Sequence, residues 1–131
     1  SESGDEVAAI HGGWRGLHAG IIANTLRHFS SPAEQIIAWL GPAIGAAKFE
    51  VGSEVKALFC EQSASHHTAF VAQADGKYLA DIYLLATTQL INLGIRNISG
   101  GEYCTVSNSE QFFSYRRDGQ TGRMASLIWR K

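Results

Sequence analysis

Short apolar runs alternate with segments of helical periodicity along this chain, and this alternation leaves few possible folds. The run 36–40 reads as a buried strand and stops at Gly41-Pro42, and the run 95–98 reads as another. Between them, apolar residues recur with the 3.6-residue period of a helix. The pattern predicts an α/β (α+β) fold whose last strands are antiparallel.

The expected elements follow from the same periodicity and from turn residues. We expect polar residues 61–67 to form a loop that exposes His66 and His67. Gly94 is expected to end the last helix. The expected strands are 7–10, 36–40, 70–71, 95–98, 112–116 and 124–129, the last two joined across Asp118-Gly119. The expected helices have their apolar faces within 14–29, 51–59 and 79–93.

Composition excludes several classes of protein. Hydrophobic residues make up 45% of the 131 residues and charged residues 18%, which argues against disorder. A net charge of −1 provides no general attraction for nucleic acid or for a membrane surface. No apolar run approaches the roughly 20 residues of a membrane helix. No secretion signal opens the chain, so we expect a cytoplasmic protein.

The segment His11-Gly12-Gly13-Trp14-Arg15-Gly16 is the first candidate site. A histidine at the end of a strand faces the rim of the sheet, where sites of α/β proteins are built. The two glycines allow the backbone to approach a ligand, and Arg15 can bind phosphate or carboxylate. A tight strand-to-helix turn with a hydrogen-bonded histidine is the alternative.

Glu50 and Cys104 are candidates from two other segments. Glu50 opens a predicted helix, where a carboxylate can act as a general base, hold a ribose hydroxyl, or only favour the helix dipole. Cys104 can be a ligand, a nucleophile or a small core residue. A Cys104–His11 pair would be the arrangement of a cysteine hydrolase. The sequence leaves open whether the two residues meet.

Arg116 and Arg117 lie in a basic segment. Residues 115–131 carry five basic side chains and one acidic side chain, although the whole chain is nearly neutral. On a strand the two arginines would point to opposite faces, so one of them could line an anion pocket. A solvated hairpin tip is the alternative.

Several motifs occur in an order that resembles the YfiH-type family, also called the multicopper polyphenol oxidoreductase or laccase-domain family. Each motif is short, but the ordered set spans residues 7–129. The family usually has alanine at the position of Gly12. The motifs are HGGWRG at 11–16, LGPAIG at 40–45, FEVG at 49–52, CT at 104–105, FSYRRDG at 113–119 and TGRMA at 121–125.

The resemblance implies a YfiH-like fold, which is a layered sandwich of mixed β-sheet with flanking helices. It also implies zinc-dependent chemistry on purine nucleosides, either phosphorolysis or adenosine deamination. The expected substrates are a purine nucleoside and phosphate. A copper-dependent polyphenol oxidase is an alternative, with Met124 as the one methionine available. A peptidoglycan editing factor and a non-catalytic binding fragment are further alternatives.

Length is the main departure from this family. Its members are about twice as long, and residues 1–131 resemble only their C-terminal portion. The resemblance implies a metal site of two histidines and one cysteine, of which only His11 has a counterpart here; Cys60 and Cys104 do not match the cysteine. We therefore expect a missing N-terminal half or another subunit to complete the metal site.

The resemblance also suggests roles for the remaining candidates. We expect Glu50 and Arg116 to act in catalysis, and His11 to bind the metal, zinc or alternatively copper. Arg15, Arg117 and Cys104 are expected to bind substrate or phosphate.

Overall fold

The computed structural model describes residues 1–130. No helix in this range is long and apolar enough to span a membrane. The α-helices are α1 (Trp14–His18), α2 (Ile21–Leu26), α3 (Ser53–Gln62), α4 (Ile82–Asn92) and α5 (Tyr115–Asp118). The strands are β1 (Ile37–Leu40), β2 (Glu50–Val51), β3 (Phe70–Ala72), β4 (Tyr78–Ala80) and β5 (Asn97–Gly100). Short 3-10 helices are η1 (Ala33–Gln35), η2 (Ala64–Ala69) and η3 (Ala74–Gly76).

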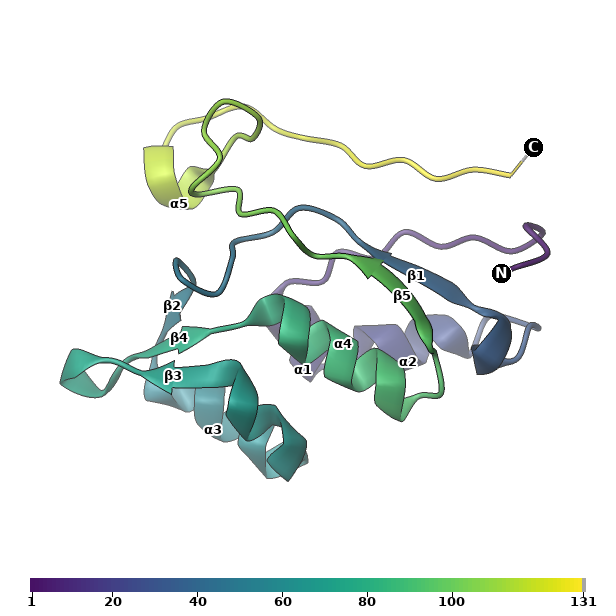
Figure 1. Ribbon diagram of the computed structural model, residues 1–131, viewed down its shortest axis with the longest axis horizontal. Helices are drawn as coiled ribbons and strands as arrows, with labels where there is room; N and C mark the ends of the chain where they lie inside the picture. The colour runs from purple at the N-terminus through teal and green to yellow at the C-terminus, as the bar shows by residue number, and fades with distance from the viewer. Residues whose placement is uncertain (131) are drawn as a thin grey trace.

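The strands form one parallel and one antiparallel sheet. β1 pairs in parallel with β5, so that Leu40 lies opposite Gly100 at the carboxyl ends of both strands. β4 lies between β2 and β3 in the antiparallel sheet. In Figure 1, α2 and α4 lie on one side of β1 and β5, and α3 lies beside the antiparallel sheet. This mixed arrangement confirms the predicted fold class.

Helix α4 confirms the helix predicted within 79–93, and its boundaries have local causes. The Asp81 side chain accepts a hydrogen bond of 2.9 Å from the Leu84 N–H and thereby caps the helix. Gly94 has a φ of +95°, a conformation that ends helices. Leu79 was assigned to this helix by periodicity but lies in β4, because the Asp81 cap begins the helix after it.

The continuous helix predicted over 14–29 is wrong. Gly20 has a φ of +79°, which no continuing helix can accommodate, and the chain therefore forms α1 and α2 separately. Leu17 of α1 and Ile22 of α2 are nevertheless both buried in the core. The apolar pattern therefore identified the core residues correctly but not the break in the backbone.

Phe59 of α3 lies at the centre of an aromatic cluster. Its side chain is 0% exposed, and ring centroids of His18, His66 and Phe70 lie 5.7, 5.5 and 6.1 Å from its own. The polar loop predicted for 61–67 is wrong here, because η2 turns His66 inward. His66 is buried, and its Nδ1 donates a 2.8 Å hydrogen bond to the Phe59 carbonyl oxygen.

The C-terminal hairpin predicted over 112–129 is also wrong. The Ser114 hydroxyl accepts a hydrogen bond from the Arg117 N–H at 3.4 Å, and this cap starts α5 in place of a strand. Residues 124–129 and 7–10 run outside any strand of the described part of the chain. A strand requires a neighbouring backbone, and these two segments have no such pairing within residues 1–130.

We expect Phe59→Ala to destabilise the protein strongly. Removing a fully buried ring leaves a cavity beside His66 and Phe70, and such changes cost about 3–5 kcal/mol. The measurement is the free energy of unfolding from urea titration, followed by circular dichroism.

Val71→Ala is the matched control. Val71 is 61% exposed on β3, next to the buried Phe70, so its truncation should change the free energy of unfolding by less than about 0.5 kcal/mol. Equal losses for the two variants would mean that Phe59 is not central to the core.

Candidate functional site

Two loops meet beyond the carboxyl ends of β1 and β5. Because the strands are parallel, the chain leaves Leu40 and Gly100 at the same edge of the sheet. An isolated parallel bridge then pairs Ala43 with Cys104, and the Thr105 N–H donates a 2.8 Å hydrogen bond to the Ala43 carbonyl. Sites of open α/β sheets are built at this edge.

The Tyr83 hydroxyl of α4 joins these loops to each other. It accepts a hydrogen bond of 2.6 Å from the Ala43 N–H and donates one of 2.7 Å to the Tyr103 carbonyl. Burial raises the pKa of Tyr83, so the phenol stays protonated and keeps its donor. The sequence analysis missed Tyr83. The sequence did contain a signal for it, namely a tyrosine near the start of an otherwise aliphatic helix, because a phenol that is partly buried there requires a polar partner.

Cys104 lies in the second loop with its thiol close to Gly45. A Cβ added to Gly45 would lie 3.3 Å from the Cys104 sulfur, so the glycine permits this approach. Partial burial raises the pKa of the Cys104 thiol, but hydrogen bonds from the Ser107 hydroxyl and from backbone N–H groups outweigh it and lower the pKa to about 7. Its recorded partners belong to its own and the neighbouring loop, and His11 is not among them.

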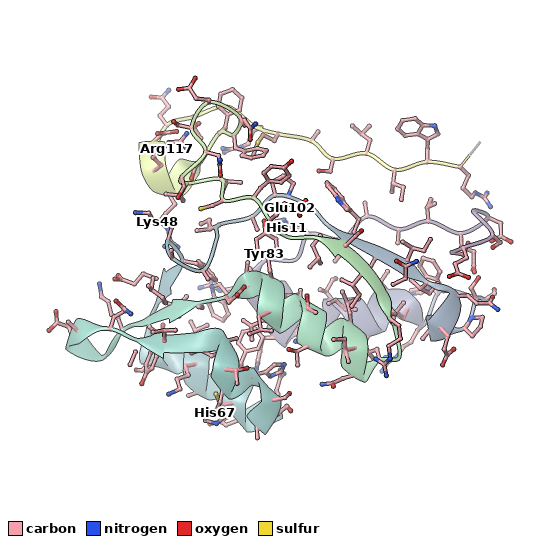
Figure 2. The ribbon with its side chains drawn as sticks, viewed as in Figure 1. His11, Lys48, His67, Tyr83, Glu102 and Arg117 are labelled. Atoms are coloured by element: carbon pink, nitrogen blue, oxygen red, sulfur yellow. The ribbon has the colours of Figure 1, made fainter. Side chains whose placement is uncertain are left out.

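His11 is exposed just before α1. Its ring lies over Gly13, where an added Cβ would be 3.2 Å from Nε2. Figure 2 labels His11 in the segment before α1, Tyr83 on α4 and Arg117 on α5. The absence of a side chain at Gly13 therefore leaves space beside the His11 ring. The ring is available to a ligand.

Glu50 and Arg116 come together although they are far apart in the sequence. The Arg116 guanidinium donates a 3.3 Å hydrogen bond to the Glu50 carbonyl oxygen and lies 5.9 Å from the Phe49 ring centroid. The Glu50 carboxylate forms an exposed 2.7 Å ion pair with Lys77. At the start of β2, Arg116 thus contacts the backbone of Glu50, and Lys77 contacts its carboxylate. The sequence analysis did not include Lys77.

Arg117 has a different environment from Arg116. Its guanidinium donates to the carbonyls of Thr105, Val106 and Phe112 and to the Asp118 carboxylate. These contacts tie the loop after Cys104 to α5, and Asp118 raises the pKa of Arg117. The donors that a phosphate would need are thus already engaged within the chain.

Arg15 is exposed on α1, where its guanidinium lies 4.3 Å from the centroid of the Trp14 ring. Stacking of this kind orients the planar group while its N–H donors stay in solvent. No hydrogen bond within residues 1–130 joins Arg15 to Glu50 or Arg116. The candidates therefore form two groups, one at the strand-end loops and one at β2, with Arg15 beside His11 in sequence.

The residues present do not by themselves fit a catalytic zinc or copper site. A catalytic zinc takes three protein ligands and keeps one open position. Within residues 1–130, no group of three or more His, Cys, Asp or Glu side chains is placed to hold a metal ion. His11 is thus one donor, and further donors would have to come from outside these residues.

Comparison with known proteins identifies similar sequences. The family model described as multi-copper polyphenol oxidoreductase laccase matches residues 1–131. The chain is 54% identical over 129 residues to a protein of Escherichia coli named purine nucleoside phosphorylase YfiH, covering 98% of this chain and 53% of that protein. It is 52% identical to a purine nucleoside phosphorylase of Haemophilus influenzae, covering 97% of this chain and 53% of that protein.

Comparison with solved structures gives the same result as the sequence comparison. A crystal structure of a Neisseria meningitidis protein superposes with a TM-score of 0.88 at 49% identity, covering 90% of this chain and 49% of that chain. The Bacillus licheniformis YfiH structure gives a TM-score of 0.76 at 29% identity, covering 82% of this chain and 43% of that chain. The chain spans about half the length of the curated relatives it matches. It belongs to the multi-copper polyphenol oxidoreductase laccase family, and the relatives to which it is similar are YfiH-type proteins.

Proposed function

We propose that this chain is the C-terminal portion of a single YfiH-like domain that phosphorolyses purine nucleosides in the cytoplasm. The name and 54% identity of the Escherichia coli relative support the activity. The observation that carries the proposal is the hydrogen bond from the Arg116 guanidinium to the Glu50 backbone carbonyl, which brings this cation to the strand that carries the Glu50 carboxylate. Phosphorolysis requires an anion-binding group and a group that holds ribose, and the two side chains supply these chemistries.

In the proposed reaction, an oxygen of phosphate forms a bond to the anomeric carbon of ribose. The bond between that carbon and the purine nitrogen breaks, and its electron pair leaves with the base, which gains one proton while hydrogen phosphate loses one. The products are ribose 1-phosphate and the free purine. Inosine, adenosine and methylthioadenosine are the candidate nucleosides.

Arg116 is proposed to bind phosphate, because it is exposed and makes one hydrogen bond within the chain, to the Glu50 carbonyl. Arg15 is also exposed and is proposed as a second anion-binding residue, in the segment of His11. Arg117 is proposed to position the loop that carries Cys104, in place of the phosphate-binding role expected from the sequence, since its donors are engaged. Glu50 is proposed to accept hydrogen bonds from the ribose hydroxyls, with Lys77 orienting its carboxylate.

His11 is proposed as one ligand of a metal site whose other ligands lie outside this chain. The family name is consistent with a metal, and the exposed ring over Gly13 is open to one. Zinc remains the proposed metal and copper its alternative, because neutral imidazole suits both ions. An additional adenosine deaminase activity, a copper-dependent polyphenol oxidase and a peptidoglycan editing or non-catalytic binding role are the alternatives.

The first prediction concerns the reaction. The protein purified from its source, with any polypeptide that accompanies it identified by native mass spectrometry, should convert inosine to hypoxanthine only when phosphate is present. Arg116→Gln should lower kcat/KM for phosphate about 10- to 100-fold, which corresponds to about 1.5–3 kcal/mol for a lost charged hydrogen bond.

Arg27→Gln is the matched control. Arg27 follows α2, where its guanidinium donates to the Asn24 side chain, and it has no place in the proposed site. Its substitution should leave the kinetics unchanged. Phosphate-independent release of hypoxanthine, or oxidation of a phenol without any phosphorolysis, would contradict the proposed reaction.

A second prediction distinguishes the role of the Glu50 carboxylate from that of its ion pair with Lys77. Glu50→Gln should reduce kcat/KM for the nucleoside at least tenfold and leave the free energy of unfolding within about 1 kcal/mol, since exposed ion pairs contribute little stability. Lys77→Gln breaks the same 2.7 Å pair but keeps the carboxylate, so its kinetic loss should be much smaller. Equal losses in the two variants would assign the effect to the ion pair and not to ribose binding.

The alternative of a cysteine hydrolase with Cys104 as nucleophile can be tested through the pKa of this thiol, which is lowered to about 7. In a Cys60→Ser background, the rate of Cys104 alkylation by iodoacetamide should rise with pH around a midpoint near 7, because only the thiolate reacts. Ser107→Ala removes a hydrogen bond to the sulfur and should raise the midpoint. If Ser107→Ala left the midpoint unchanged, the hydrogen bond from Ser107 would not be the cause of the lowered pKa of Cys104. Full activity in Cys104→Ala would exclude the hydrolase.

A further inference from the structure

Helix α1 is too short to hold its position through its own backbone. It has five residues, Trp14–His18, and Gly20 with its φ of +79° separates it from α2. A helix of about one turn leaves most of its N–H and C=O groups without a partner inside the helix. Helices of this length do not form by themselves in water. The position of α1 therefore depends on contacts with other elements.

Two glutamine side chains from other helices bind the carboxyl end of α1. The Gln62 amide at the end of α3 donates a 2.7 Å hydrogen bond to the His18 carbonyl oxygen. The Gln89 amide of α4 donates a 3.2 Å hydrogen bond to the Leu17 carbonyl oxygen. Carbonyls in the last turn of a helix have no acceptor role inside that helix and require such outside donors. The two amides therefore attach this end of α1 to α3 and to α4.

Side chains at the same end of α1 contact the core. Leu17 is buried, and the His18 ring lies edge-on to the Phe59 ring of α3, with centroids 5.7 Å apart. Burial of an apolar side chain is favourable in many orientations, because the hydrophobic effect is not directional. A hydrogen bond requires donor and acceptor to be aligned. The amides of Gln62 and Gln89 are therefore suited to fix the rotation of α1 and its position along its own axis.

The amino end of α1 carries two residues of the candidate site. Arg15 lies on the helix itself, with its guanidinium 4.3 Å from the centroid of the Trp14 ring. His11 packs against the same turn. A Cβ added to Gly16 would lie 3.3 Å from the His11 carbonyl oxygen, and one added to Gly13 would lie 3.2 Å from its Nε2. A rotation or shift of α1 would therefore move both Arg15 and His11.

We propose that Gln62 and Gln89 are positioning residues, which hold α1 in the place where Arg15 can bind phosphate. They act through the helix, since their hydrogen bonds are to its backbone. This inference rests on the anion-binding role proposed for Arg15. The sequence analysis did not include either glutamine, because their partners His18 and Leu17 are 44 and 72 residues away along the chain.

The test measures the Kd of inorganic phosphate by calorimetry, on the protein preparation used in the inosine assay. Methionine has a similar length to glutamine but no donor, so the double variant Gln62→Met/Gln89→Met removes both hydrogen bonds without adding a charge. It should raise the Kd about fivefold, as expected for about 1 kcal/mol from two weakened hydrogen bonds. Arg15→Gln should raise the Kd at least as much. In an Arg15→Gln background the two methionines should change the Kd less than about twofold, because they act through Arg15.

Gln73→Met is the matched control. The Gln73 amide also donates to a backbone carbonyl, that of Ala72 at 2.9 Å, but it lies in the turn after β3. Its substitution should leave the Kd within about twofold, as for a site that shares no partner with α1. If the double variant does not fold, the single variant Gln62→Met provides the same comparison at an exposed position.

Three results would overturn the proposal. The methionine variants could bind phosphate like the unchanged chain, they could weaken binding equally with and without Arg15, or the unchanged protein could bind no phosphate at all. A protein that binds phosphate with the expected dependence on Gln62, Gln89 and Arg15, but does not cleave inosine, would refute the proposed reaction and leave the positioning role intact.

Discussion

The parallel pairing of β1 with β5 is the interaction on which the candidate site depends. It brings the segment after Leu40 and the segment after Gly100 to the same edge of the sheet, and the bridge between Ala43 and Cys104 continues their pairing. The Tyr83 hydroxyl then holds both loops through the Ala43 N–H and the Tyr103 carbonyl. The second loop has further hydrogen bonds between Cys104 and Asn108 and from Arg117, but the strand pair and the Tyr83 phenol join the two loops to each other.

The neighbouring arginines show how position in the fold separates the roles of identical side chains. On a short helix capped by Ser114, Arg117 turns back to three carbonyls and Asp118, while Arg116 reaches the backbone of β2. Arg117 therefore contributes to loop structure, and Arg116 retains donors for a ligand. A guanidinium that is surrounded by acceptors within the chain cannot also bind a phosphate with the same N–H groups.

The sequence by itself determined the elements whose signals are local. The apolar run of β1, the helical period of α4 with its stop at Gly94, and the mixed α/β class all follow from periodicity and turn residues. The motifs around His11, Glu50 and Arg116 likewise identified candidate residues, because their spacing is visible along the chain.

Only the tertiary structure determined the features that depend on contacts between residues far apart in the sequence. Residues 7–10 and 124–129 have strand-like composition, but strands form only where a neighbouring backbone accepts their hydrogen bonds. The inward position of His66 depends on the Phe59 carbonyl, and the separate roles of Arg116 and Arg117 depend on carbonyl groups of other segments. Periodicity reports which side chains are apolar, whereas hydrogen bonds between distant segments decide where the backbone turns and which polar groups remain free.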